Sequence, residues 1–335
     1  RAIRTGNSAM QIATEQMATS TLANPPSQFD FVQGIKSLPT KSYCGIPSAG
    51  PQPTTTTESP DGRDSPRIFL HDCLVWDGNG DVETSYDLIL ENGIIKEMGK
   101  VLSHSNAQYV ECDNRILTPG LIDIHSHAGV YSLPEIWATA DGNEMTNPTV
   151  PMMRSIDAFN PKDNALTEIL SGGVTSIQVL PGSGNVMGGE SSYYKIRPNR
   201  TISAMRIKGA PRGLKMACGE NPKRVYGSRR QMPMSRMGSA WTMRQEFESA
   251  RKLMFAQDDW DCASSGTRYP EDLSIEPLVQ LLRGEMILNV HCYKVEDLEM
   301  VVRLSKEFNF SVSSFHHALE AYRFPSLLVD NDIIA

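Results

Sequence analysis

The sequence contains no long apolar run, no CxxC pair of cysteines and no excess of positive charge. Because a membrane-spanning helix needs about 20 consecutive apolar residues, we expect no membrane partner. A formal net charge of -7 has the wrong sign for a protein that binds nucleic acid. The six scattered cysteines argue against a zinc ribbon and a dense disulfide framework, and favour a reducing, cytoplasmic compartment. The expected partner is therefore a small-molecule substrate.

The first 66 residues differ in composition from the rest of the chain. Residues 25–66 are rich in Pro, Ser, Thr and Gly, most clearly in PQPTTTTESPDGRDSP. Such a segment cannot bury enough apolar surface to fold alone, so we expect residues 1–66 to form a disordered tail and linker. With 335 residues, 40% of them hydrophobic, the chain as a whole can still bury a large core.

Two patterns of secondary structure follow the linker. Residues 67–117 contain β-rich runs separated by DGNG (77–80) and ENG (91–93), which predict hairpin turns in a small antiparallel β-sandwich portion. Residues 118–335 alternate apolar strands with helices, which predicts an α/β fold with a parallel sheet, either open or closed into a (β/α)8 TIM barrel. The expected strands are 121–127, 174–180, 193–196, 213–218, 286–292, 311–317 and the start of a seventh at 332–335; the expected helices are 163–171, 242–255, 275–283 and 295–308.

Five of the seven histidines lie at the carboxyl ends of predicted strands. His125 and His127 end the first strand in PGLIDIHSHAG, and residues two apart on a strand point to the same side. His291 ends MILNVHC, and His316 and His317 end SVSSFHH. Since the loops of a parallel barrel converge at this face, three or four of these imidazoles could bind one cation. Adjacent strand residues alternate faces, so we expect His317, which a small residue follows, to be the ligand of the last pair.

The stretch ILTPGLIDIHSHAG resembles the signature of the amidohydrolase superfamily, specifically its imidazolonepropionase-like, metal-dependent branch. NVHC and FHHALEAY are similar to the histidine motifs of the family's fifth and sixth strands, and the resemblance runs from about Ile68 to the end of the chain. It implies a (β/α)8 TIM barrel of the metal-dependent hydrolase type, with a small β-sandwich built from both chain ends. It also implies hydrolysis of a C–N bond with one or two divalent metals, zinc first and iron or manganese as alternatives.

The resemblance assigns ligands residue by residue. His125 and His127 would bind the first metal, and His291 and His317 would bind the second metal or a shared site. Members of the family often bridge two metals with a carboxylated lysine or a glutamate from the middle strands.

Three residues could supply that bridge: Lys215 within a predicted strand, Glu220 just after it, and Lys195. Only a neutral amine reacts with CO2 to give a carbamate, and burial near a barrel axis favours the neutral form. We therefore take Lys215 as the metal ligand. The structural alternative is a lysine at a strand edge that reaches solvent.

Two further segments border the predicted strands. The glycine-rich PGSGNVMGGES (181–191) lacks the GK[ST] ending of a P-loop and the GxGxxG spacing of a dinucleotide site, so we expect a mouth loop that shapes the pocket. Residues 206–236 carry nine Lys or Arg against one Glu. They could hold a substrate carboxylate, although such runs more often face water.

Together these features predict a hydrolase of a non-peptide or cyclic carbon–nitrogen bond. A metal-bound water whose pKa falls to about 7 would supply a metal-activated hydroxide. In the superfamily the general base is an Asp at the end of the eighth strand. The chain ends at Ala335 inside the predicted seventh strand, so we expect a fragment with an incomplete barrel and assign no catalytic residue. The alternatives are a noncatalytic metal-binding or partner-binding protein, and a structural interaction protein, against which the histidines argue; the sequence is compatible with a homo-oligomer.

Overall fold

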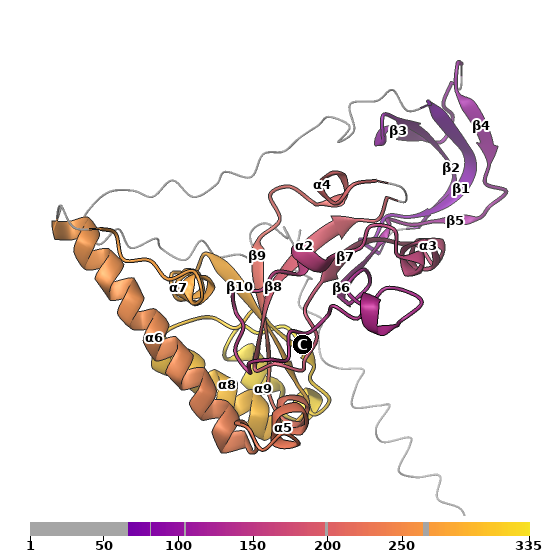
Figure 1. Ribbon diagram of the computed structural model, residues 1–335. Helices are drawn as coiled ribbons and strands as arrows, with labels where there is room; N and C mark the ends of the chain where they lie inside the picture. Colours follow the sequence, from indigo (N-terminus) through magenta and orange to yellow (C-terminus); the bar gives the residue numbers. More distant parts are fainter. Residues whose placement is uncertain (1–65, 81, 104, 198–199, 264–267) are drawn as a thin grey trace, which may run out of the picture. The chain divides into compact units, whose positions relative to one another are not determined.

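The computed structural model describes residues 66–80, 82–103, 105–197, 200–263 and 268–335 (Figure 1). These residues all belong to one structural unit, Ser42–Ala335. Apart from residue 66, the expected disordered tail at 1–66 lies outside the described residues. Among the helices of the described residues, none is both long enough and apolar enough to cross a membrane.

The first sheet contains five strands in two kinds of pairing. Strands β1 (Ile68–Trp76), β2 (Val82–Glu91) and β3 (Ile94–Gly99) form consecutive antiparallel hairpins, and their turns lie where DGNG and ENG predict them. Strands β4 (Gln108–Glu111) and β5 (Ile116–Leu117) pair with β1 in parallel. The prediction of a wholly antiparallel unit was therefore wrong, because the chain crosses from β3 to the far edge of β1 before pairing again.

The second sheet contains six strands whose order in space follows their order in the chain. Their bounds are β6 (Leu121–Ser126), β7 (Val174–Val179), β8 (Met187–Lys195), β9 (Arg212–Ala217), β10 (Met286–Cys292) and β11 (Ser314–His317). The pairs β6–β7, β9–β10 and β10–β11 are parallel, as predicted.

Strand β8 departs from the prediction because it runs antiparallel to both of its neighbours. The glycine-rich segment 181–191 was predicted to be a mouth loop, but its second half forms the start of β8. A short connection can join only antiparallel neighbours, whereas a parallel crossover needs a dozen or more residues. Val179 ends β7 and Met187 begins β8, so the chain has no room for a crossover. The glycines permit the tight return; Gly189, at a φ of +119°, has no space for a Cβ, which would lie 2.3 Å from the carbonyl oxygen of Met153.

The described strands form a curved mixed sheet, and a closed (β/α)8 barrel is not seen in the described part of the chain. The curvature brings the two outer strands together, because His125 on β6 and His316 on β11 are in contact. A further bridge pairs Ser314 with Ile334 in parallel, next to β11.

The helices lie mostly between successive strands, as an α/β pattern predicts. They are α2 (Ser155–Ala158), α3 (Asn164–Ser171), α4 (Ile202–Met205), α5 (Glu220–Gly227), α6 (Arg236–Ala263), α7 (Glu276–Leu282), α8 (Val295–Phe308) and α9 (Pro325–Val329), with short 3-10 turns η1 (Trp137–Thr139) and η2 (Ala321–Arg323). Helix α6 begins six residues before the predicted start, because the Ser235 hydroxyl caps it by accepting from the Gly238 amide at 3.1 Å.

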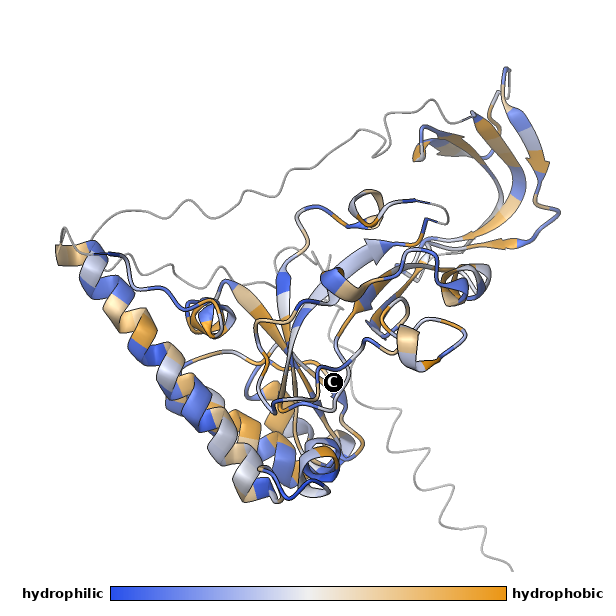
Figure 2. Cartoon of the chain, viewed as in Figure 1, coloured by the Kyte–Doolittle hydropathy of each residue, from blue (hydrophilic) through white to orange (hydrophobic). Residues whose placement is uncertain are grey.

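The main core lies between the second sheet and helices α6, α7 and α8. Helix α8 buries Leu298, Val301 and Phe308 at helical spacing, and it ends at Asn309 in the left-handed region. These side chains pack in one cluster with Phe247 of α6 and Leu288 of β10. Figure 2 shows hydrophobic colour on β10, paler colour on β8 and mixed colour along α6.

Candidate active site

Five histidines and one lysine come together at one end of the second sheet. The ring centres of His125 and His127 lie 5.1 Å apart, and that of His317 lies 4.7 Å from His125 and 4.6 Å from His291. We call this group the histidine cluster; its members are His125, His127, Lys215, His291, His316 and His317. The structure therefore gathers all the residues that the sequence nominates as ligands, with His316 in addition.

His316 is the member of the cluster with the most hydrogen-bond partners. It is 5% exposed, and its Nε2 lies 2.9 Å from the Ser314 hydroxyl and 3.2 Å from the Asn289 side-chain oxygen. Because a side-chain carbonyl can only accept, the Asn289 oxygen assigns the proton of this ring to Nε2. The Nδ1 atom then accepts from Nδ1 of His125, at 2.6 Å.

His127 is held by the backbone of the neighbouring strand. Its Nδ1 lies 2.8 Å from the carbonyl oxygen of Leu180, just after β7. Since that carbonyl only accepts, Nδ1 carries the proton and the lone pair of the ring is on Nε2.

His317 lies at the end of β11 in a conformation that the alternation rule does not cover. Its φ is +67°, and that of Ala318 is +39°, so the strand geometry stops here. As a result, the rings of both His316 and His317 lie beside His125, at 4.6 and 4.7 Å between ring centres. The choice of His317 as the ligand stays a prediction.

Lys215 is completely buried in β9. Its Nζ donates to the carbonyl oxygen of Pro181 at 3.0 Å, and burial lowers its pKa to about 7. The structural alternative of a lysine that reaches solvent is therefore wrong, and a substantial fraction of the amine is neutral at neutral pH.

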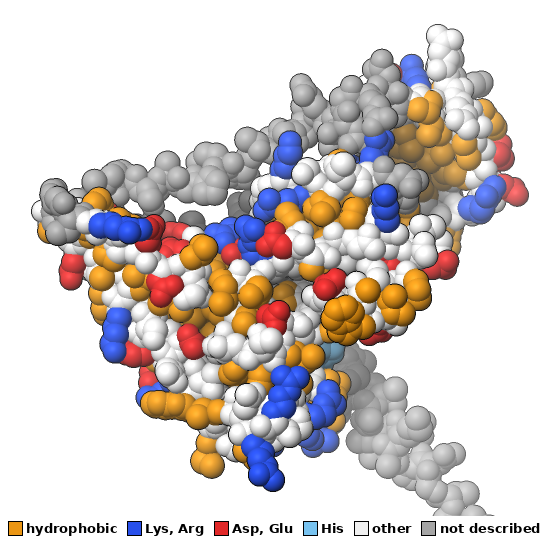
Figure 3. All heavy atoms as spheres, in the orientation of Figure 1, with side chains coloured by type: hydrophobic (Ala, Val, Ile, Leu, Met, Phe, Trp, Pro, Cys, Tyr) orange, Lys and Arg blue, Asp and Glu red, His pale blue; other side chains and the backbone are white. Residues whose placement is uncertain are grey.

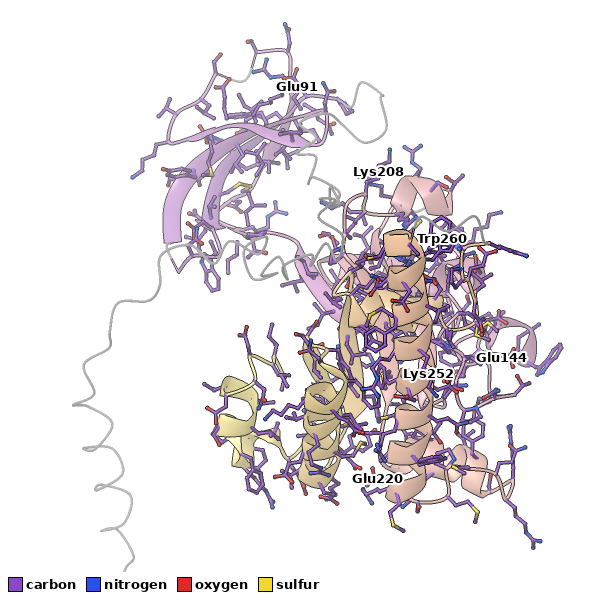
Figure 4. The ribbon with its side chains drawn as sticks, turned by 90° about the vertical axis from the view of Figure 1, so that its left-hand side faces the viewer. Glu91, Glu144, Lys208, Glu220, Lys252 and Trp260 are labelled. Carbon is purple, nitrogen blue, oxygen red and sulfur yellow. A yellow bond between two sulfur atoms is a disulfide. The ribbon has the colours of Figure 1, made fainter. Side chains whose placement is uncertain are left out.

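The other two bridge candidates lie outside the cluster. Glu220, labelled in Figure 4 beside one end of α6, is half-exposed and forms an ion pair with Arg236 at 3.0 Å. Lys195 ends β8 with an exposed side chain. Of the three, only Lys215 lies with the histidines.

The imidazoles are neutral at physiological pH. Burial, and secondly the charge of Lys215, lower the pKa of His125 to about 2, that of His291 to about 3 and that of His316 to about 4. Little histidine surface is visible on the face drawn in Figure 3. Neutral imidazole is the form that binds a metal ion.

The neutral imidazole nitrogens of the cluster are suitable ligands for a divalent cation, although the contact between His125 and His316 has to lengthen for both to bind one ion. The buried Nδ1 of His291 has no hydrogen-bond partner among the described residues, as expected for a nitrogen whose partner is an ion. In the part of the chain that the structure describes, no three His, Cys, Asp or Glu side chains are yet arranged around a common point. The 2.6 Å contact between His125 and His316 is too short for both nitrogens to bind one ion, because two nitrogens at about 2.0 Å from a tetrahedral ion are about 3.3 Å apart.

The sequence did not indicate several neighbours of the cluster. The side-chain nitrogen of Asn221 lies 3.0 Å from Nε2 of His291 and 2.8 Å from the Ser183 hydroxyl. Disulfides join Cys218 to Cys292, next to His291, and Cys73 to Cys112. The scattered spacing of the cysteines was a poor guide here, because strand pairing brings together residues 74 positions apart.

Comparison with known proteins finds amidohydrolases and dihydroorotases among the proteins similar to this chain. No family model matches the chain. Over 315 residues the chain is 38% identical to amidohydrolase tasK of Hapsidospora irregularis, in an alignment that covers 84% of this chain and 32% of that protein. The chain thus spans about a third of the length of this curated relative. A segment of 61 residues, 18% of this chain, is 37% identical to a dihydroorotase of Trichlorobacter lovleyi, of which it covers 14%. The crystal structure of an amidohydrolase from Thermotoga maritima superposes with a TM-score of 0.73 at 32% identity, covering 80% of this chain and 69% of that one.

Proposed function

Because this chain belongs to the amidohydrolase superfamily, we propose that it is a metal-dependent hydrolase of a non-peptide or cyclic carbon–nitrogen bond, of the imidazolonepropionase-like type. The observation that carries the proposal is the histidine cluster itself. Neutral imidazoles from three separate strands surround one another beside a fully buried lysine. Such a group has few structural uses, since each buried ring must be paired or ligated.

Different histidines of the cluster would bind different ions. His125 and His127 would hold one ion, and His291 with His317 or His316 would hold a second or share the first. When bound, one or two divalent cations, zinc by the nitrogen-rich donor set, would polarise the scissile carbonyl and activate a water molecule. Leu180 fixes the ring of His127 so that its Nε2 lone pair is available.

Lys215 would bridge the ions as a carbamate. The neutral amine forms a bond to the carbon of CO2 and releases one N–H proton, which gives an anionic oxygen donor at the end of a long side chain. Burial supplies the neutral amine, and the backbone oxygen of Pro181 holds Nζ in place until the reaction.

Two cavities near the cluster are large enough for small-molecule substrates. One, of about 310 Å³, is lined by His125, His316 and His317. The other, of about 590 Å³, is lined by Pro181 together with Asp141 and other residues. Both lie in the range of small-molecule sites, which supports a compact substrate.

Metal analysis of the purified protein tests the proposal. We expect about one or two equivalents of zinc, iron or manganese per chain in the wild type, and loss of that metal in His125→Ala/His127→Ala. His71→Ala, which removes a histidine from the first sheet, should keep it.

The metal-loaded protein is then screened against cyclic and N-acyl amides, with and without chelator. Hydrolysis that chelation abolishes supports the proposal. Metal without hydrolysis supports the noncatalytic metal-binding alternative, and absence of metal from the wild type contradicts metal dependence.

A further inference from the structure

We propose that Asn221 is a positioning residue that holds His291 in the tautomer with the proton on Nε2, so that the lone pair on Nδ1 faces a divalent cation. The presence of the cation rests on the proposed function. The tautomer of His291 is argued from the geometry around its ring and does not depend on the cation. The Asn221 amide lies 3.0 Å from Nε2 of His291, and Nδ1 of the same ring is buried with no partner among the described residues.

The hydrogen bonds around Asn221 can be satisfied in two ways. With nitrogen toward the ring, the amide donates to Nε2, which places the proton on Nδ1 and leaves a buried N–H donor without an acceptor. An unmade hydrogen bond of this kind costs about 1–3 kcal/mol. With oxygen toward the ring, the amide accepts from Nε2–H, and Nδ1 keeps a lone pair.

Ser183 is compatible with the second arrangement. Its hydroxyl lies 2.8 Å from the same atom of Asn221 and can rotate to donate instead of accept. An amide oxygen has two lone pairs, so it can accept from Ser183 and from His291 at once. The oxygen and nitrogen of an asparagine amide are exchanged by a half-turn of the side chain, so the position of the group is unchanged.

The neighbouring strand already uses this arrangement. The Asn289 oxygen lies 3.2 Å from Nε2 of His316 and 2.8 Å from the Ser314 hydroxyl. The Asn289 pair therefore combines an asparagine, a serine and a strand-end histidine, as the Asn221 pair does. The same chemistry at two adjacent strand ends favours the oxygen-facing orientation of Asn221.

The chain just before helix α5 is hydrogen-bonded to β10, which makes Asn221 suited to positioning. Gly219 turns the chain at a φ of +71°, where a Cβ would lie 2.7 Å from a carboxylate oxygen of Asp297. The backbone of Cys218 bonds the His291 carbonyl oxygen at 2.9 Å. Asn221 is thus fixed relative to the strand whose histidine it contacts.

The first test is the tautomer itself, measured on chelated protein by NMR of ¹⁵N-labelled histidine rings. The His291 signals are assigned by their loss in His291→Gln. We expect the proton on Nε2 in the wild type and in Asn221→Asp, which keeps an acceptor, and a mixed or reversed tautomer in Asn221→Leu. A proton on Nδ1 in the wild type would overturn the proposal.

The second test is zinc affinity of the same variants. Loss of an outer partner of a ligating histidine typically lowers metal affinity about 10- to 100-fold, so we expect that loss in Asn221→Leu and retention in Asn221→Asp. If Asn221 instead donates to His291 through its amide nitrogen, or has a purely structural role through that nitrogen, zinc affinity should also fall in Asn221→Asp.

The matched control is Asn160→Leu, because Asn160 is a half-buried asparagine that bonds the hydroxyl of Ser132 and, among the described residues, no histidine. It should bind zinc as the wild type does. Unchanged zinc affinity in Asn221→Leu overturns the positioning role. If the wild type binds no zinc, the proposed function fails and the cation part of this inference with it, whereas the NMR result still decides the tautomer.

Discussion

His125 and His316, which are 191 residues apart in the chain, meet through their Nδ1 atoms at a distance of 2.6 Å. One lies on the first strand of the second sheet and the other on the last described strand. Their contact means that the histidine cluster depends on the curvature of all six strands, and not only on the HxH motif.

The two histidines at the end of β11 should behave differently when replaced. His316 is buried and bonded to three side chains, so His316→Ala should lower the free energy of unfolding by about 1–3 kcal/mol. His317 is exposed, so His317→Ala should change it by less than about 0.5 kcal/mol while weakening zinc binding. Urea unfolding and zinc titration of both variants provide the measurement. Equal stability losses, or unchanged zinc binding in His317→Ala, would show that the roles are assigned incorrectly.

Replacing Lys215 should lower zinc affinity much more than it lowers the free energy of unfolding. Methionine has a similar length and no charge, so Lys215→Met should alter the free energy of unfolding by less than about 1.5 kcal/mol. Without the bridging donor, zinc affinity should fall by at least about 100-fold. The exposed lysine Lys208, labelled in Figure 4, is the control, and Lys208→Met should change neither quantity. Full zinc affinity in Lys215→Met would exclude the bridge.

The first sheet should show a pH-dependent stability that comes from one hydrogen bond. His71 Nδ1 lies 2.8 Å from an oxygen of Asp87, and this bond raises the pKa of His71 above 6.5. Burial acts to raise the pKa of Asp87, but hydrogen bonds from Leu102, His71 and Asp72 outweigh it and hold the pKa below 3.8.

The sign of each contribution follows from these directions. The raised pKa of His71 gives stability that is complete below pH 6.5 and is lost as pH rises through the folded-state pKa. The lowered pKa of Asp87 gives stability that is complete above pH 3.8 and is lost on acidification. Urea unfolding is measured from about pH 3 to about pH 8. The loss of unfolding free energy caused by Asp87→Asn should be largest between pH 3.8 and pH 6.5. Asp113→Asn, at an exposed position, should show no such maximum, and a deficit that does not vary with pH in Asp87→Asn would contradict the assignment.

Arg236 should be strongly stabilising because it neutralises a buried carboxylate. Its Nε and Nη2 bond the two oxygens of Asp297 at 2.9 and 3.0 Å, and the Asp297 side chain is only 1% exposed. Burial raises the pKa of Asp297 even with this partner present. Arg236→Ala should lower the free energy of unfolding by about 3–5 kcal/mol, since it leaves a buried charge unpaired.

Removing both partners should be less harmful than removing the arginine alone. The double variant Arg236→Ala/Asp297→Ala removes the buried carboxylate together with its partner, so part of the loss should be recovered in a double-mutant cycle. Additive losses in the cycle would mean that the two side chains do not interact.

The sequence predicted the strand-end histidines because apolar strands and a two-residue spacing are local signals. His125 and His127 could be placed on one side of a strand from their spacing alone, and the structure gathers them with His291. The resemblance to the superfamily was confirmed by the relatives. The ligand roles remain predictions, since they depend on an ion.

Other features could not be predicted, because they depend on tertiary contacts. The direction of β8 was missed because the predicted strand began at residue 193, which hid the short connection after β7, and side-chain alternation is the same for parallel and antiparallel strands. The conformation at His317 depends on two consecutive positive φ angles, at His317 and Ala318, and alternation fails as soon as the strand ends. Asn221 follows Glu220 at the start of a helix, and no sequence pattern links it to His291, which lies 70 residues later in the chain.

The sequential order of strands β6 to β11 has a consequence for how the protein is made. Each strand pairs with the one synthesised before it, so a chain emerging from the ribosome can add every new strand to an edge that already exists. The contact between His125 and His316 is the exception, because it joins the first and the last of these six strands. The proposed metal centre can therefore form only after β11 has been synthesised, because two of its histidines lie on that strand.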